Sequence, residues 1–252
     1  ANYPLEFMAG LMQTNLGNAE KISRDLEEAK EMSIKVLPPD INESYTDFKI
    51  EKNKFIRFGL GAIKNSSEKV MSNIVKERLK NGHFKNLDDL IIRVGTTSLS
   101  KKDLECLIKV GAMDSFGKRN QLLTVVPLAF ENAQITEKKK AGGQTGLFAA
   151  IENSTDIAAT PFPTVKAETD QDRIAWEKEM LGTFLTAHPL EKYINAMLSD
   201  TIAPVNSVFE KKEAEKIQIL CIIISKKVIL TKKSGKPMAF LQLEDLTGKI
   251  EG

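Results

Sequence analysis

The sequence predicts a mainly helical protein of the α+β class, divided into two or three domains. Three observations lead to this prediction. The apolar period of helices recurs through residues 3–135, it returns at 170–181, and β-branched runs separated by turns follow residue 217. The 252 residues are 42% hydrophobic, which is sufficient to build that number of globular domains.

The first 58 residues are expected to combine two helices with a small sheet. Residues 3–32 carry apolar stripes at helical spacing, and Asn18 is placed to cap the second helix. A short apolar run at 34–37 predicts a strand, because two prolines follow it directly. Apolar residues then alternate with polar ones through 48–58 around a polar turn, which predicts a β-hairpin.

Residues 59–135 are expected to form short helices joined by tight turns. Asn86 is placed to cap one helix, and Ser100 begins another with a sequence close to a capping box. That helix should stop at a compact turn, residues 111–117, which has a glycine at each end. The following helix contains Pro127, which is expected to kink or divide it.

The middle of the chain carries its positive charge. Residues 55–140 hold 16 Lys and Arg against 9 Asp and Glu, a net charge of +7, whereas the flanking segments are net negative. An excess of this kind favours a polyanionic partner. Around 111–117, glycines let the backbone approach a phosphate, and Lys118 and Arg119 add charge beside the start of the next helix. An ordinary helical hairpin with a solvated basic face explains the same spacing, so both interpretations stay open.

A segment without helical or strand period separates this region from the rest. Residues 141–165 contain glycines, prolines and threonines, and within them lies the peptide Gln144-Thr145-Gly146-Leu147-Phe148. Two apolar anchors beside an amide side chain on such a segment are typical of a linear docking motif. The alternative is that Leu147 and Phe148 fold back onto a neighbouring domain.

The last third of the chain changes from helix to strand. Residues 170–181 predict an amphipathic helix, and Pro189 suits the first turn of another. From residue 217, apolar and β-branched runs at 217–231, 238–243 and 249–250 are separated by turns, which predicts an antiparallel meander.

Several kinds of site are not expected. Cys106 and Cys221 lie in apolar surroundings far apart, which favours small core residues in a reducing, cytoplasmic compartment over a disulfide or a metal pair. His83 and His188 have no ligand at metal-binding spacing, so no metal site is predicted. No glycine-rich phosphate loop or nucleophile motif is present, and no catalytic residue is predicted. No apolar run approaches the roughly 18 residues of a membrane span, so no membrane partner is expected.

In order along the chain, these segments resemble the alpha subunits of bacterial DNA polymerase III, the C family of replicative polymerases. The resemblance is carried by five stretches and the pentapeptide at 144–148. The five are Tyr3-Pro4-Leu5-Glu6-Phe7-Met8-Ala9, Val36-Leu37-Pro38-Pro39-Asp40-Ile41-Asn42, Arg57-Phe58-Gly59-Leu60-Gly61-Ala62-Ile63-Lys64, Leu107-Ile108-Lys109-Val110-Gly111-Ala112-Met113-Asp114 and Leu181-Gly182-Thr183-Phe184-Leu185-Thr186-Ala187-His188-Pro189-Leu190.

The resemblance implies a domain order. It is the C-terminal part of a fingers domain (1–54), a tandem helix-hairpin-helix domain that holds double-stranded DNA (55–140), a linker with a sliding-clamp motif (141–165), a helical connector (166–213) and a partial OB-fold (214–252). In the clamp motif, Gln144 would hydrogen-bond at the rim, and Leu147 and Phe148 would fill an apolar pocket on the clamp. Thr145 and Gly146 depart from the residues that the family often has there.

The resemblance also implies which residues meet DNA. They are Lys64, Asn65, Ser66, Ser67, Lys101, Lys102, Gly111, Gly117, Lys118 and Arg119. Asn65, Ser66 and Ser67 replace a Gly-hydrophobic-Gly turn of the family, although Asn tolerates the positive φ that such a turn needs.

The family's palm, with its Mg²⁺-binding aspartates, would lie upstream of residue 1, so no cofactor is expected here. The chain is therefore expected to be an inactive fragment of a DNA-directed DNA polymerase, reaching other holoenzyme subunits through its parent. A stand-alone nucleic-acid-binding accessory protein that recruits a clamp is the alternative, and an enzyme with an unrecognised site is a third.

Overall fold

The computed structural model shows two compact units, residues 1–186 and 187–252. It describes residues 3–141, 160–185, 190, 193, 202–210, 215–231, 235–245 and 247–251. Helices dominate and the sheets are small, so the predicted α+β, mainly α, class is confirmed.

The first unit opens with two helices and a three-stranded sheet. The helices are α1 (Pro4–Thr14) and α2 (Ala19–Glu31), and the strands are β1 (Lys35–Leu37), β2 (Lys49–Glu51) and β3 (Phe55–Arg57). Asn18 caps α2 by accepting the Lys21 N–H at 3.1 Å, as predicted. The β2–β3 hairpin is also confirmed, and β1 joins β3 in parallel to give the order β1-β3-β2.

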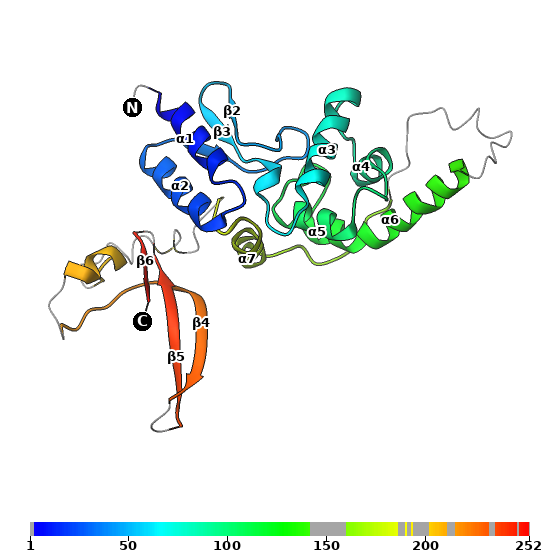
Figure 1. Cartoon of the computed structure of the whole chain (residues 1–252). Helices are drawn as coiled ribbons and strands as arrows, with labels where there is room; N and C mark the ends of the chain where they lie inside the picture. Colours follow the sequence, from blue (N-terminus) through cyan, green and yellow to red (C-terminus); the bar gives the residue numbers. More distant parts are fainter. Residues whose placement is uncertain are drawn as a thin grey trace. The chain divides into compact units, whose positions relative to one another are not determined.

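The helical part of this unit follows the sheet. Its elements are η1 (Leu60–Ala62), α3 (Glu68–Asn81), α4 (Leu87–Val94), α5 (Lys101–Lys109), α6 (Arg119–Ala141) and α7 (Asp170–Leu181) (Figure 1). The caps of α4 by Asn86 and of α5 by Ser100 are confirmed, the latter as a full capping box. Pro127 does not divide α6, because buried side chains on both of its sides, at Val126 and Ala129, hold the helix against its neighbours.

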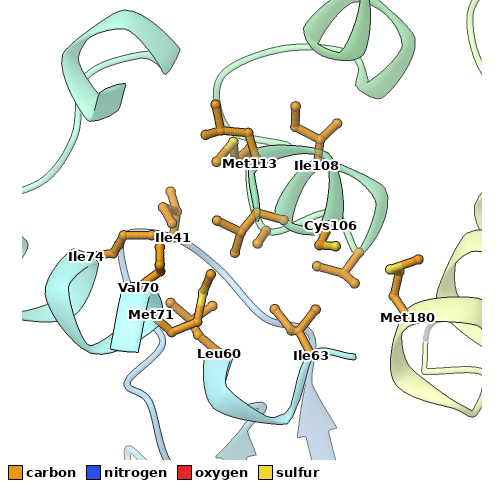
Figure 2. Packing of buried hydrophobic residues seen from close by; sticks show 14 of the residues in the cluster. Ile41, Leu60, Ile63, Val70, Met71, Ile74, Cys106, Ile108, Met113 and Met180 are labelled. Carbon is orange, nitrogen blue, oxygen red and sulfur yellow. The ribbon is translucent and has the colours of Figure 1, made fainter. Parts of the chain in front are cut away.

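One apolar core joins the sheet to the helices. Ile41, Leu60 and Met71 are fully buried and face the α5–α6 turn, where Met113 is also fully buried (Figure 2). The backbone links the same regions, since the Ile41 N–H donates to the Ala112 carbonyl at 2.8 Å. The helical hairpins are therefore anchored to the N-terminal part of the unit and do not form a separate body.

The second unit contains a short 3₁₀ helix, η4 (Val205–Glu210), and an antiparallel sheet. Its strands β4 (Ile222–Leu230), β5 (Pro237–Glu244) and β6 (Lys249–Glu251) pair in the order β4-β5-β6, which confirms the meander. The first strand begins at Ile222 and not at 217 as predicted, and a register shift bends it after Ile223. In the described residues this sheet is open, and Ile223, Val228 and Leu230 are more than half exposed. Its assignment to an OB-fold stays a prediction.

Candidate nucleic-acid interface

The first hairpin turn joins η1 to α3 through residues 63–67. Asn65 has φ +62°, the left-handed conformation that the sequence predicted for it. The Ser66 hydroxyl closes the turn by donating to the Ile63 carbonyl at 2.7 Å. Two backbone N–H groups tie the turn to the rest of the unit: Lys64 donates to the Met180 carbonyl at 2.8 Å, and Ser67 donates to the Asp103 carboxylate at 3.2 Å.

The helix that leaves this turn has an open N-terminus. Ser67 is the N-cap residue of α3, yet its side chain accepts no hydrogen bond from the first turn. By contrast, α2, α4, α5 and α7 each have a side-chain cap. The first N–H groups of a helix bear a partial positive charge and need an acceptor. The start of α3 can therefore receive an anion.

Two of the lysines predicted to contact DNA, Lys101 and Lys102, lie beside the residue that binds the start of α3. Lys101 and Lys102 are exposed in the first turn of α5, and Asp103 beside them is the residue that accepts the Ser67 N–H. We call these residues the first-hairpin patch: Lys64, Asn65, Ser66, Ser67, Lys101 and Lys102. The structure brings together six of the ten predicted DNA-contact residues.

The second hairpin turn lies at the other end of α5, about 13 Å along its axis for nine residues. Gly111 has φ +82°, so the glycine is required there. Arg119 is only 5% exposed, and its guanidinium donates twice to the Asp114 carboxylate, at 2.8 and 2.9 Å, and once to the Lys109 carbonyl. Arg119 therefore closes the turn, while Lys118 is exposed beside it.

The start of α6 is covered by the segment that precedes α7. A Cβ on Gly117 would come within 3.1 Å of the Phe162 ring, and the Asn120 side chain donates to the Lys166 carbonyl at 3.0 Å. The Glu168 carboxylate accepts the Asn120 backbone N–H at 3.2 Å. An internal carboxylate thus occupies the position at the α6 N-terminus where the sequence predicted a phosphate.

Glu168 is the main residue of this region that sequence reasoning missed. Its side chain is 1% exposed and pairs with Arg173 at 2.9 Å. Burial raises the pKa of this carboxyl, but hydrogen bonds from backbone N–H groups and from Arg173 outweigh it and lower the pKa to about 2. The capping box of Thr169 and Asp172 that follows could have located the start of α7. No local signal shows that Glu168 reaches α6.

The other residues singled out in the sequence are the peptide 144–148, the histidines and the two cysteines. The peptide 144–148 and His188 lie outside the described residues. Burial raises the pKa of both thiols, Cys106 and Cys221. In the ranges that the structure describes, no group of His, Cys, Asp and Glu could hold a metal ion. Nor does any described helix have the length and apolarity to cross a bilayer.

Comparisons with known proteins agree with this geometry. Residues 33–122 match the family model of the helix-hairpin-helix motif, which confirms the predicted domain type. Three proteins named DNA polymerase III subunit alpha are similar along the chain. The protein from Bacillus subtilis is 37% identical, that from Borreliella burgdorferi 36% and that from Thermus aquaticus 32%. Each match covers 100% of this chain, and it covers 22%, 22% and 20% of the three relatives, respectively.

The chain spans about a fifth of the length of the curated relatives it matches. The resemblance first recognised in separate stretches of sequence holds from one end of the chain to the other. The chain is therefore similar, over its whole length, to a segment of the alpha subunit of bacterial DNA polymerase III.

Proposed function

We propose that this chain is the DNA-binding and clamp-tethering region of a replicative DNA polymerase, and that it holds duplex DNA behind the site of synthesis. The observation that carries this proposal is the first-hairpin patch, where an uncapped helix N-terminus and three lysines face solvent or lie half-buried around one turn. The match to the helix-hairpin-helix motif and the similarity to polymerase alpha subunits support it.

The chemistry of the patch suits a phosphate. Backbone N–H groups at a helix start donate to phosphate oxygens without regard to sequence, and lysines near them displace condensed counterions. The second hairpin contributes differently. Lys118 adds one exposed charge, and Arg119 supports the turn from inside through Asp114. In this proposal the main contact lies at α3, and Gly111, Gly117 and Arg119 shape the neighbouring turn.

Neutralising the lysines of the patch tests the proposal. We expect K64Q/K101Q/K102Q to weaken duplex binding. The negative slope of log K against log salt should become shallower by up to about 2.7, since each phosphate contact contributes about 0.9 to its magnitude. Fluorescence anisotropy with a labelled duplex at several salt concentrations measures this slope. The control K21Q/K52Q/K54Q removes three exposed lysines from α2 and the β2–β3 turn. Equal slopes in the two variants would contradict the proposed DNA site.

Clamp tethering rests on the peptide 144–148 and needs its own test. Leu147 and Phe148 would each be worth about 1.5–3 kcal/mol if buried on a clamp. We expect L147A/F148A to abolish micromolar binding to a purified bacterial sliding clamp in a calorimetric titration. The control I151A/I157A removes two apolar side chains of the same segment outside the motif. Unaltered binding by L147A/F148A would refute clamp docking through this peptide and would leave the DNA site untouched.

A further inference from the structure

Helix α3 carries a row of lysines beyond the two hairpin turns, within the residues 33–122 that match the helix-hairpin-helix motif. Lys69, Asn73, Lys76 and Lys80 follow the spacing i, i+4, i+7 and i+11, which places them within about 60° of one another around the helix. The three lysines are exposed, and within the described part of the chain none forms an ion pair at 4 Å or less. We call these four residues the α3 strip.

The strip borders a polar hollow of about 220 Å³ between α3 and α4. Asn73, Lys76 and Lys80 line it from α3, and Arg93 lines it from α4. The hollow is largely open to solvent, so its lining side chains can be reached by a ligand from outside.

The acidic residue of the hollow, Glu77, already has partners. Glu77 accepts from the Arg93 guanidinium at 3.1 Å and from the Asn81 side chain at 2.7 Å. Arg93 is in turn held by the carbonyls of Gly82 and His83, at 2.8 and 3.1 Å. Arg93 also pairs with Asp89 at 3.2 Å, so its single charge is shared between two carboxylates. Lys76 and Lys80 are the exposed cations that line the hollow, and Lys80 also attracts Glu77.

Two features of the strip are unfavourable for the helix by itself. Lys76 and Lys80 are like charges at i and i+4, which repel, and Lys69 lies in the first turn, where the helix dipole disfavours a cation. Lys80 lies in the last turn, where the dipole favours a cation. A bound polyanion would relieve the repulsion and the unfavourable position of Lys69. The strip rises about 16 Å along the axis, which corresponds to about five nucleotides of one strand at 3.4 Å each.

We propose that the α3 strip is a second contact surface for the nucleic-acid backbone, continuous with the first-hairpin patch and running from it along α3. The inference rests on the proposed DNA-binding function and extends it to residues outside the hairpin turns. An acidic protein is a poorer fit, because protein interfaces depend on apolar anchors. On α3 a single large apolar side chain is exposed, Leu79, which lies about 60° around the helix from Lys76 and about 100° from Lys80.

The test compares the whole 252-residue chain with three variants on the same labelled duplex. K69Q/K76Q/K80Q is expected to make the slope of log K against log salt shallower by about 2.7, because three phosphate contacts are lost. K69R/K76R/K80R keeps the charges and is expected to retain the slope. K21Q/K52Q/K54Q is the matched control, and its slope is expected to stay that of the unaltered chain. Glutamine is nearly as good a helix former as lysine, and circular dichroism checks that each variant is folded.

The outcomes separate the strip from the hairpin. A lowered slope in K69Q/K76Q/K80Q, with no change in the control, supports the strip. An unchanged slope there, together with a lowered slope in K64Q/K101Q/K102Q, overturns the strip and leaves the proposed function standing. Equal losses in the strip variant and in the control also overturn it. No duplex binding by the unaltered chain at 50 mM salt overturns both proposals. If the triple variant does not fold, K76Q and K80Q singly are each expected to lower the slope by about 0.9.

Discussion

Gly111→Ala is expected to lower the free energy of unfolding of the first unit by about 3 kcal/mol, combining backbone strain with loss of a buried charge pair. A Cβ at Gly111 would lie 2.1 Å from Arg119 Nη2 and 2.8 Å from its Cζ, so the guanidinium must leave its place. The displaced guanidinium would lose its hydrogen bonds to the Asp114 carboxylate and to the Lys109 carbonyl while it is still mostly shielded from water. Half of the Asp114 side chain is exposed, so water can solvate its carboxylate and limit the loss of stability.

Gly17→Ala is the control for this effect. Gly17 has nearly the same φ, +88°, but no atom lies within 4 Å of the added Cβ. Its expected cost is the strain alone, about 1 kcal/mol. Urea unfolding followed by the fluorescence of Trp176, which lies in α7, measures both variants. If the two substitutions cost the same, the contact of Arg119 with Asp114 does not hold the second hairpin.

Glu168→Gln is expected to remove an acid-sensitive contribution to stability of at most about 3 kcal/mol at pH 7. The carboxyl pKa is about 2 in the folded chain against an ordinary value of 4.5. A lowered pKa stabilises the fold above the unfolded value, and this stabilisation is lost as the pH falls from about 4.5 toward 2. The neutral amide keeps the shape of the side chain but loses the charged bonds to Asn120 and Arg173.

The measurement is urea unfolding, followed by Trp176 fluorescence, at pH 7, 5 and 3. Glu168→Gln should be clearly less stable than the unaltered chain at pH 7, and the difference should shrink at pH 3. Glu179→Gln is the control, because that carboxylate is half exposed and only 3.9 Å from Lys109. A difference that stays constant with pH would show that the Glu168 charge does not hold α7 against α6.

Features that depend on near neighbours in sequence were predicted from sequence. The caps by Asn18, Asn86 and Ser100 follow from residue type three positions before a helical N–H, and the structure has all three. The positive φ of Asn65 was predicted in the same way, from what a side chain allows its own backbone. The similarity to polymerase alpha subunits was likewise read from short stretches, and it extends over the whole chain.

Features that depend on distant residues needed the tertiary structure. Arg119 reads as a free cation beside a glycine turn, but its guanidinium is buried against Asp114. The α6 N-terminus reads as open to phosphate, but Glu168, 48 positions from Asn120, already caps it. Ser67 precedes α3 as its N-cap residue, but its side chain accepts no hydrogen bond from the first turn, which only the structure shows.

By itself, then, the sequence determined most of the helices, the caps of α2, α4 and α5, the hairpins and the family resemblance, because these depend on periodicity and on bonds within a few residues. Only the tertiary structure decided which of the predicted cations and helix ends face solvent. A charge or an N–H group binds whichever partner the fold brings within about 3 Å, and an internal carboxylate competes there with any external phosphate. At α6, Glu168 accepts the Asn120 N–H of the first turn. At α3, Asp103 accepts only the N–H of the N-cap residue Ser67, and the first turn has no side-chain cap.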